Sequence, residues 1–145
     1  MRQALAVLLL ATFTSGCMLY SYGQFDPLSS GREFDEAQLR FTRLVRWNQW
    51  EKASEMVAPD SRERFREVMA GLEGVKFTDW ETILVDMSKG LKTAEVQVQI
   101  EGYREATLLH ASARMTQNWE RLPGASSPWV VRPDVEPLAA AFALR

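Results

Sequence analysis

Between residues 33 and 72, hydrophobic residues recur at the three- and four-residue spacing of amphipathic helices. The first stretch begins at Glu33, and its apolar positions are Phe34, Ala37, Phe41, Leu44 and Val45. The pattern changes phase at residues 46–48, which predicts a bend and then a second helix that ends at Pro59. The new face of this second helix carries Trp47, Trp50, Ser54 and Val57. A third helix is predicted from Asp60, with Gly71 and Gly74 marking its end. Its apolar positions are Phe65, Val68, Met69 and Leu72.

Each predicted helix start also carries the spacing of a capping box, in which a small polar residue precedes a glutamate by three positions. The three pairs are Ser30 with Glu33, Asn48 with Glu51, and Asp60 with Glu63. In such a box each side chain satisfies a backbone N–H that the first helical turn leaves unpaired. The pairs therefore support helix starts close to these positions.

After Gly74 the spacing changes to the two-residue alternation of β-strands. Residues 75–87 are rich in strand-forming residues on both faces. In the next segment the apolar residues Ala94, Val96, Val98 and Ile100 alternate with Glu95, Gln97, Gln99 and Glu101. The apolar face of a third segment consists of Leu109, Ala111, Ala113, Met115 and Trp119. The second and third strands are therefore each predicted to have one buried face and one face in water.

The register of this pair follows from a tight turn near Arg104 and Glu105. It predicts Ile100 opposite Leu109, Val98 opposite Ala111, and Val96 opposite Ala113. On the polar face it predicts Glu95 opposite Arg114 and Gln99 opposite His110. Residues 129–131 predict a short last strand, and residues 135–144 predict either a loosely docked helix or a frayed end.

The N-terminal residues have the pattern of an export signal. Arg2 precedes an apolar run over residues 4–13, and the small residues Ser15 and Gly16 lead to Cys17, the only cysteine of the chain. A membrane-spanning helix needs about 20 apolar residues, so this run fits a signal segment better. One alternative is an ordinary secretory signal followed by an incidental cysteine.

The residues before Cys17 resemble the lipobox of bacterial lipoproteins. The resemblance implies cleavage ahead of Cys17 and acylation of its thiol, so that the chain is held to a membrane by a lipid anchor. It also implies the outer membrane, on the periplasmic side, because Met18 rather than aspartate follows the cysteine. A lipidated thiol also explains how an exported chain carries a lone cysteine, which has no disulfide partner within the chain.

These features divide the chain into a signal peptide (1–16), a lipidated cysteine and flexible tether (17–32), one α+β domain (33–132) and a C-terminal tail with a possible short helix (133–145). Without residues 1–16 the net charge changes from −2 to −3, because only Arg2 is lost. This charge argues against nucleic acid as a partner. Five Trp, seven Phe and three Tyr provide the apolar area of a packed core.

The predicted order, three helices and then a meander of antiparallel strands, resembles the NTF2-like (cystatin-like) α+β cone. The local resemblance is carried by Trp50-Glu51-Lys52-Ala53, by Val57-Ala58-Pro59-Asp60, and by Arg62 to Phe65. The resemblance implies N-terminal helices packed on a curved antiparallel sheet over residues 33–132. The usual family sheet has at least one more long strand than this sequence predicts.

In enzymes of that superfamily the cone holds an acid or base in an apolar pocket. The polar strand residues that could play this part are Asp79, Asp86, Tyr103 and His110. The candidates for lining a pocket are Asp79, Trp80 and Tyr103. Asp79 and Glu81 share a face with Phe77, Ile83 and Val85 if the alternation is regular, but an exposed strand edge explains these carboxylates better. His110 falls on a polar face, which favours a histidine directed to solvent or to a partner.

The chain contains one histidine and one cysteine, so the sequence predicts neither a metal site nor a cofactor. It has no glycine-rich phosphate loop or nucleophile elbow, and we expect no enzyme. The basic row Arg40, Arg43 and Arg46 is read as a solvated helix face rather than a contact for lipid headgroups. The expected function is that of an envelope interaction module. Its contact surface for a protein partner or a second copy is predicted to be Gln97, Gln99, His110 and Arg114. The alternative is an apolar ligand, or isomerase or dehydratase chemistry, in a pocket of the cone.

Overall fold

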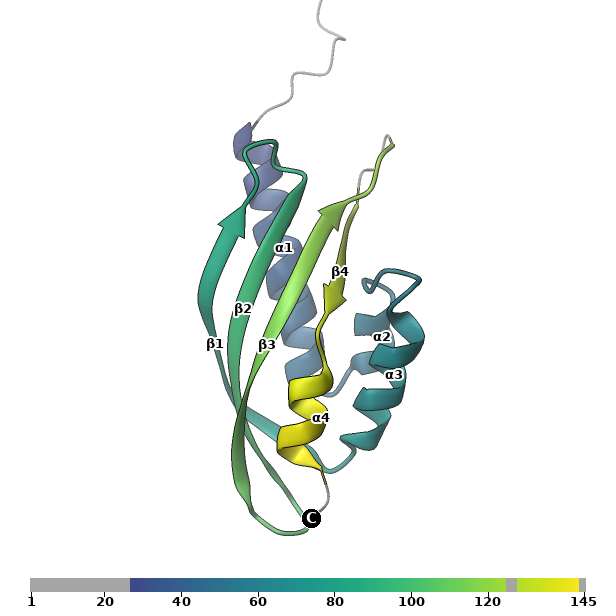
Figure 1. Ribbon diagram of the computed structural model, residues 1–145, viewed down its shortest axis with the longest axis vertical. Coiled ribbons are helices and arrows are strands. Elements are labelled where there is room, and N and C mark those ends of the chain that lie inside the picture. Colours follow the sequence, from purple (N-terminus) through teal and green to yellow (C-terminus); the bar gives the residue numbers. More distant parts are fainter. Residues whose placement is uncertain (1–26, 125–127, 144–145) are drawn as a thin grey trace, which may run out of the picture.

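The computed structural model describes residues 27–124 and 128–143, and Cys17 lies outside this part. The helices are α1 (Pro27–Arg46), α2 (Trp50–Ser54), α3 (Arg62–Gly71) and α4 (Glu136–Phe142). The strands are β1 (Val75–Met87), β2 (Thr93–Arg104), β3 (His110–Arg121) and β4 (Trp129–Pro133), and they form one antiparallel sheet in the order β1-β2-β3-β4 (Figure 1). The predicted α+β class, with N-terminal helices on an antiparallel sheet, is confirmed.

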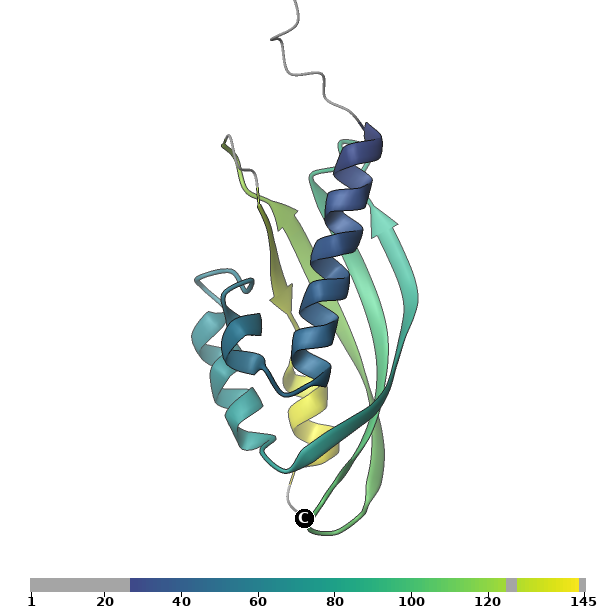
Figure 2. The ribbon, with the colours of Figure 1, turned by 180° about the vertical axis from the view of Figure 1, so that it is seen from behind.

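Helix α1 runs along one face of the sheet, which we call the inner face (Figure 2). Its side chains Phe34 and Phe41 are buried and lie edge-on against Trp119 of β3, with ring centroids 5.9 and 5.8 Å apart. Aromatic rings prefer this edge-to-face arrangement, and each ring removes a large apolar area from water. The core therefore lies between α1 and the sheet, and the opposite, outer face is left to solvent.

The predicted bend after the first helix is confirmed, because α1 ends at Arg46 and α2 begins at Trp50. Asn48, between them, has a φ of +54°, a conformation that asparagine tolerates better than most residues. The predicted start at Glu33 is wrong, since α1 already begins at Pro27 and includes residues assigned to the tether. Proline suits the first position of a helix because no intrahelical partner is needed there for its missing N–H. No helix in the described part of the chain is both long and apolar enough to cross a membrane.

The predicted capping boxes do not form. Ser30 lies within α1, and the residues that precede α2 and α3 are Gln49 and Ser61, neither of which makes a side-chain cap hydrogen bond. Asn48 instead donates from Nδ2 to the carbonyl oxygen of Val75 at 3.2 Å, and Asp60 accepts hydrogen bonds from Arg132 of β4. Long-range partners have therefore replaced the local ones.

The faces predicted for β2 and β3 are confirmed, whereas their register is wrong. Ile100 lies opposite Ala113, Val98 opposite Met115 and Val96 opposite Gln117. The tight turn is replaced by a loop over residues 105–109, in which the N–H of Leu108 donates to the oxygen of Arg104 at 2.8 Å. The register moves by an even number of residues, which changes every partner but leaves the side chains within the paired strands on their predicted faces. Leu109, predicted on the buried face, lies in the loop instead and is 66% exposed.

Strand β1 has two irregularities that regular alternation does not predict. Phe77 pairs with Gly102 and Asp79 with Glu101, so the strand carries one extra residue between them, and a second shift occurs between Thr82 and Leu84. Such bulges reverse the side-chain alternation of a strand. Phe77 is therefore buried while Asp79 is exposed on the outer face, and the prediction that they share a face is wrong.

The C-terminal segment is firmly docked, in contrast to the predicted loose or frayed end. Leu138 and Phe142 of α4 are buried, and the Phe142 ring lies 5.8 Å from that of Phe77. The buried guanidinium of Arg104 donates to the oxygens of Phe142 at 2.6 Å and Glu73 at 2.9 Å. This side chain thereby links β2 to Glu73, which follows α3, and to Phe142, the last residue of α4.

Candidate functional site on the outer face of the sheet

The outer face of the sheet consists of cross-strand rows, which the pairing of the strands defines. One row runs across all strands through Asp86, Glu95, Asn118 and Arg132. A second row contains Glu81, Gln99 and Arg114, and a third contains Asp79, Glu101 and Ser112. Side chains directly opposite each other in an antiparallel sheet have Cβ atoms about 5 Å apart, so each row is a set of direct neighbours.

Negative charge is concentrated on the β1 and β2 half of this face. The carboxylates are Asp79, Glu81, Asp86, Glu95 and Glu101. Two like-charged pairs lie directly opposite one another, Asp79 with Glu101 and Asp86 with Glu95. Within the described residues none of the five forms an ion pair with a cation. Like charges at directly opposed positions destabilise a sheet, so this arrangement is unfavourable in the isolated chain.

Three of the four residues predicted as a contact surface come together. Gln99 lies opposite Arg114, and Gln97 occupies the neighbouring row, where its Nε2 donates to Glu95 Oε1 at 3.3 Å. His110 lies opposite Tyr103, with their rings 5.3 Å apart. Tyr103 lies four positions along β2 from Gln99, or about 13 Å. The predicted pairs Gln99 with His110 and Glu95 with Arg114 are therefore wrong.

The three pocket candidates do not line a common pocket. Trp80 faces the core, where its Nε1 is buried without a hydrogen-bond partner, whereas Asp79 and Tyr103 lie on the outer face. The bulge at residue 78 separates Asp79 from the apolar face it was expected to share. The alternative reading, an exposed strand edge at Asp79 and Glu81, is confirmed. Across residues 27–124 and 128–143 no carboxylate is buried.

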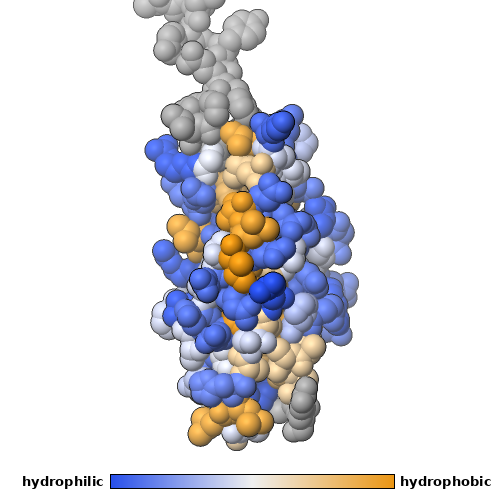
Figure 3. All heavy atoms as spheres, turned by 60° about the vertical axis from the view of Figure 1, so that its left-hand side comes forward, coloured by the Kyte–Doolittle hydropathy of each residue, from blue (hydrophilic) through white to orange (hydrophobic). Residues whose placement is uncertain are grey.

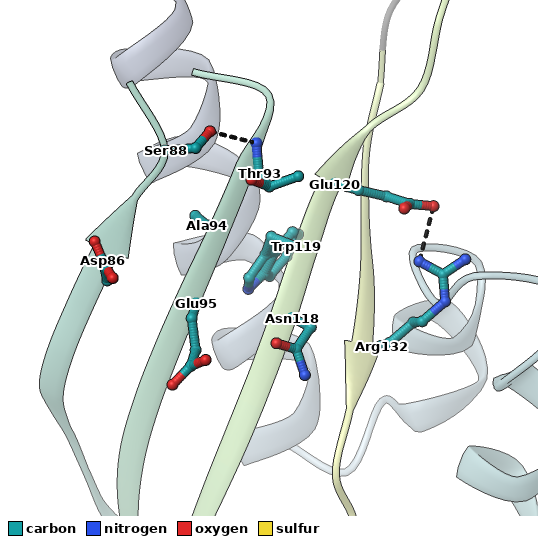
Figure 4. Close-up of a pocket in the computed structure, with 9 residues that line it drawn as sticks. All are labelled: Asp86, Ser88, Thr93, Ala94, Glu95, Asn118, Trp119, Glu120 and Arg132. Carbon is teal, nitrogen blue, oxygen red and sulfur yellow. Dashed lines mark hydrogen bonds and ion pairs between the residues drawn. The ribbon is translucent and has the colours of Figure 1, made fainter. Parts of the chain in front are cut away.

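A shallow depression of about 380 Å³ lies at the end of the outer face where β1 passes into β2 (Figure 4). Asp86, Glu95 and Asn118 lie side by side across three strands, and Arg132 approaches from β4. The Arg132 guanidinium is already held by Glu120 at 2.8 Å and by Asp60 at 3.0 Å. The depression therefore keeps the negative charge of Asp86 and Glu95.

The pKa values of the Arg132 cluster follow from its hydrogen bonds. The bonds from Arg132 lower the pKa of Asp60, and the carboxylates of Glu120 and Asp60 raise the pKa of Arg132. Both shifts favour the charged forms of Asp60 and Arg132, and Arg132 stays hydrogen-bonded to its two acidic partners. No group of His, Cys, Asp and Glu side chains in the described part of the chain could hold a metal ion.

The basic row of α1 only partly matches its prediction. Arg40 and Arg43 are exposed, as expected of a solvated helix face. Arg46 instead donates from Nη2 to the carbonyl oxygen of Thr78 at 2.9 Å, at the first bulge of β1. Sequence reasoning missed this contact because neither the bulge nor the position of β1 beside α1 could be read from periodicity.

The opposed carboxylates were not predicted from the sequence. Alternation had already placed Glu95 and Glu101 in water, but the partner of β1 and its register were not predicted. The acidic content of both strands was the available signal. Comparison with protein-family models and with curated protein sequences gives no match for this chain. Its function is therefore inferred from its own residues and their arrangement.

Proposed function

We propose that this chain is an envelope lipoprotein, held to the periplasmic side of the outer membrane through Cys17, whose domain is a non-catalytic binding module for a protein partner. Support for the anchor comes from the N-terminal pattern: a basic start, a short apolar run and small residues before the lone cysteine. More than one acyl chain at that residue gives stable membrane attachment.

The observation that carries the binding role is the uncompensated negative charge on the outer face. Opposed like-charged pairs weaken the isolated sheet. Residues that lower the stability of a fold in this way are found mainly at functional sites. A positively charged partner surface relieves this repulsion when it docks, and it also speeds association by electrostatic steering. Gln97, Gln99 and Arg114 lie in adjoining rows and provide hydrogen-bonding groups for specificity.

A heterologous partner fits this face better than a second copy of the chain. The outer face carries six carboxylates when Glu120 is included, against Lys76, Arg114 and Arg132. Face-to-face association of two copies brings both sets of carboxylates into one interface. Repulsion between them opposes a homodimer, whereas a basic patch on another envelope protein is complementary.

We also propose a distant relationship to the NTF2-like cone. The long helix α1 along a twisted antiparallel sheet and the order of three helices before the strands are in keeping with it. The described sheet has four strands, and its inner face packs against Phe34, Phe41 and other core side chains. Because no described carboxylate is buried, this packing favours a binding role over isomerase or dehydratase chemistry in a pocket.

Site-specific photo-crosslinking in intact cells tests the binding role. A photoreactive residue at Gln99 is expected to capture an envelope protein, and the matched position Arg43 on the exposed side of α1 is expected to capture much less. Loss of the Gln99 product after Glu95→Lys and Glu101→Lys supports the electrostatic contact. Equal capture from both positions overturns it.

Metabolic labelling with palmitate tests the anchor. The wild-type chain is expected to incorporate label and to fractionate with the outer membrane, and Cys17→Ser is expected to abolish both. Label that persists in Cys17→Ser overturns the assignment of the anchor. This result is independent of the crosslinking result, so the two parts of the proposal fail separately.

A further inference from the structure

Strand β1 forms one edge of the sheet, and its second half is unusually open. All six residues from Glu81 to Asp86 are exposed, although the strand continues to pair with β2 throughout. Val85 pairs with the buried Val96, which directs it to the inner face, yet it is 49% exposed. Helix α1 therefore does not cover this part of β1, and both of its faces are accessible.

The open half of β1 presents large apolar side chains. Ile83, Leu84 and Val85 are 45%, 44% and 49% exposed. With the β1 edge brought forward, hydrophobic side chains gather in the middle of the molecule between blue, hydrophilic surroundings (Figure 3). Soluble proteins usually protect an edge strand with a covering element or with charges directed along it. An exposed strand edge without such protection can accept an extended segment as an additional strand.

The two halves of the edge differ in how their backbone groups are satisfied. At the first bulge, Arg46 Nη2 binds the oxygen of Thr78 at 2.9 Å, and Asp79 Oδ1 accepts the N–H of Trp80 at 2.8 Å. These two contacts occupy backbone groups of the first half. Among the described residues, no side chain makes such a bond to the backbone between Glu81 and Met87. This half retains the free edge that main-chain pairing requires.

The charges around the free edge select the kind of strand that it accepts. Asp79, Glu81 and Asp86 lie on β1, and Glu95 and Glu101 lie beside them on β2. If the β1 strands of two copies paired, three carboxylates from each would be brought together, which like-charge repulsion opposes. Basic side chains on one face of an added strand lie next to the outer-face carboxylates Glu81 and Asp86, and aliphatic side chains on its other face lie against Val85 on the inner face.

We propose that residues 81–87 of β1 bind an extended segment of a partner protein by β-strand addition, and that this segment alternates aliphatic residues with lysine or arginine. Main-chain hydrogen bonds extend the sheet by one strand, and the alternating side chains supply selectivity. This interaction uses the edge rather than the outer face of the sheet. It depends neither on the lipid anchor nor on docking at Gln99.

The proposal is tested with the purified full chain in detergent and a fluorescent heptapeptide that alternates valine and lysine. Fluorescence anisotropy is expected to detect saturable binding that a peptide alternating valine and glutamate does not reproduce. A valine–lysine peptide N-methylated at every residue keeps the charge but cannot donate main-chain hydrogen bonds. It is expected to bind at least about tenfold more weakly, because the ladder supplies most of the affinity. Equal binding of the methylated peptide overturns strand addition.

Variants of the protein locate the site. Val85→Asn is expected to weaken peptide binding about tenfold, whereas the matched change Leu109→Asn, at an exposed leucine on the β2–β3 loop, leaves it unchanged. The double change Glu81→Lys and Asp86→Lys is expected to reverse the peptide preference, so that the valine–glutamate peptide binds more tightly than the valine–lysine peptide. Because these two side chains are exposed, this double variant tests the site even if Val85→Asn is unstable.

Two measurements distinguish strand addition from dimerisation through the β1 edge and from peptide binding at the outer face. Sedimentation equilibrium of the peptide-free chain is expected to show a monomer, and a dimer that Val85→Asn dissociates assigns the edge to a second copy and overturns the proposal. Peptide binding is expected to persist in Arg114→Glu, which alters the outer face. If Arg114→Glu abolishes peptide binding while Val85→Asn has no effect, the peptide binds the face and strand addition is wrong.

Discussion

Asp86 of β1 lies directly opposite Glu95 of β2, and both carboxylates project from the outer face of the sheet (Figure 4). Replacing Glu95 with Gln removes the repulsion and keeps the size of the side chain. Glu95→Gln is expected to raise the free energy of unfolding by about 0.5 kcal/mol, measured by urea denaturation at low salt. Glu73→Gln, at an exposed glutamate between α3 and β1 that forms no ion pair within the described residues, is the control and is expected to change stability less. A destabilised Glu95→Gln variant contradicts the electrostatic interpretation.

Arg104 is expected to be the most sensitive charged residue of the fold. It is buried and donates to carbonyl oxygens of Glu73 and Phe142, which a shorter or apolar side chain leaves unpaired. Arg104→Met is expected to lower the free energy of unfolding by about 3 kcal/mol, because buried carbonyls lose their donors. Hydrogen exchange is expected to show that α4 loses protection first.

The control for this prediction is Arg43→Met, at an exposed arginine of α1, for which little change is expected. Arg104→Lys is expected to recover only part of the stability, since a single ammonium group lacks the planar fork that reaches separated acceptors. Full recovery with lysine would contradict the role of the guanidinium geometry.

Gly102 is expected to tolerate no side chain. A Cβ atom at this position meets the backbone oxygen of Lys76 at 2.6 Å and a ring carbon of Phe142 at 3.3 Å. Since backbone in a paired strand cannot easily move aside, Gly102→Ala is expected to lower stability by about 2 kcal/mol. Gly90→Ala is the matched control, because no atom lies within 4 Å of its added Cβ. Thermal unfolding of the two variants distinguishes a steric clash from a general effect of replacing glycine.

The link between Asp60 and Arg132 predicts a dependence of stability on pH. Hydrogen bonds from Arg132 lower the pKa of Asp60 below its ordinary value of 3.8 in the folded state. A lowered folded-state pKa stabilises the fold above that ordinary value, and the contribution is lost as the pH falls through the folded-state pKa. The wild type is therefore expected to exceed Asp60→Asn in stability at pH 7. Urea denaturation is expected to show the difference shrinking below about pH 4. A difference that stays constant to pH 2 contradicts the prediction.

Glu136, the first residue of α4, provides a second comparison. Its carboxylate binds Arg64 of α3 at 2.7 Å, and this hydrogen bond lowers its pKa below the ordinary value of 4.5. The stability difference between the wild type and Glu136→Gln is also expected to shrink on acidification. The decrease is expected to begin at a slightly higher pH than for Asp60→Asn, because the ordinary pKa of glutamate is 4.5 rather than 3.8. These exposed pairs are also screened by salt, so both differences are expected to diminish at high ionic strength.

Much of the secondary structure could be predicted because local patterns determine it. The phase change after Val45 marked the end of α1, and the alternation from Ala94 to Ile100 assigned β2 its buried face. Residues 75–87 were predicted as a strand with the limits that β1 has. In α1 and β2 the side-chain period and the need to bury one face lead to the same assignment.

The pairing of distant segments was beyond local patterns. The even register shift between β2 and β3 satisfies the same alternation as the predicted register, so only the loop over residues 105–109 decides between them. Asn48 and Asp60 had local capping partners in sequence, but Val75 and Arg132 are their partners in the fold. The partners in a hydrogen bond between distant elements depend on how those elements pack. A local sequence motif does not contain that information.

The α+β class, the faces of β2 and β3 and the N-terminal pattern that ends at Cys17 could be read from the sequence, since each depends on composition and short-range period. The exposure of Asp79 on the outer face, the pairing of Asp86 with Glu95 and the exposed edge at Ile83 to Val85 emerged only when the chain was folded. Bulges and strand order cause this, because they change which face and which neighbour a side chain has without changing its place in the local period. A single extra residue in β1 reverses its faces, and the position of α1 leaves half of that strand in water.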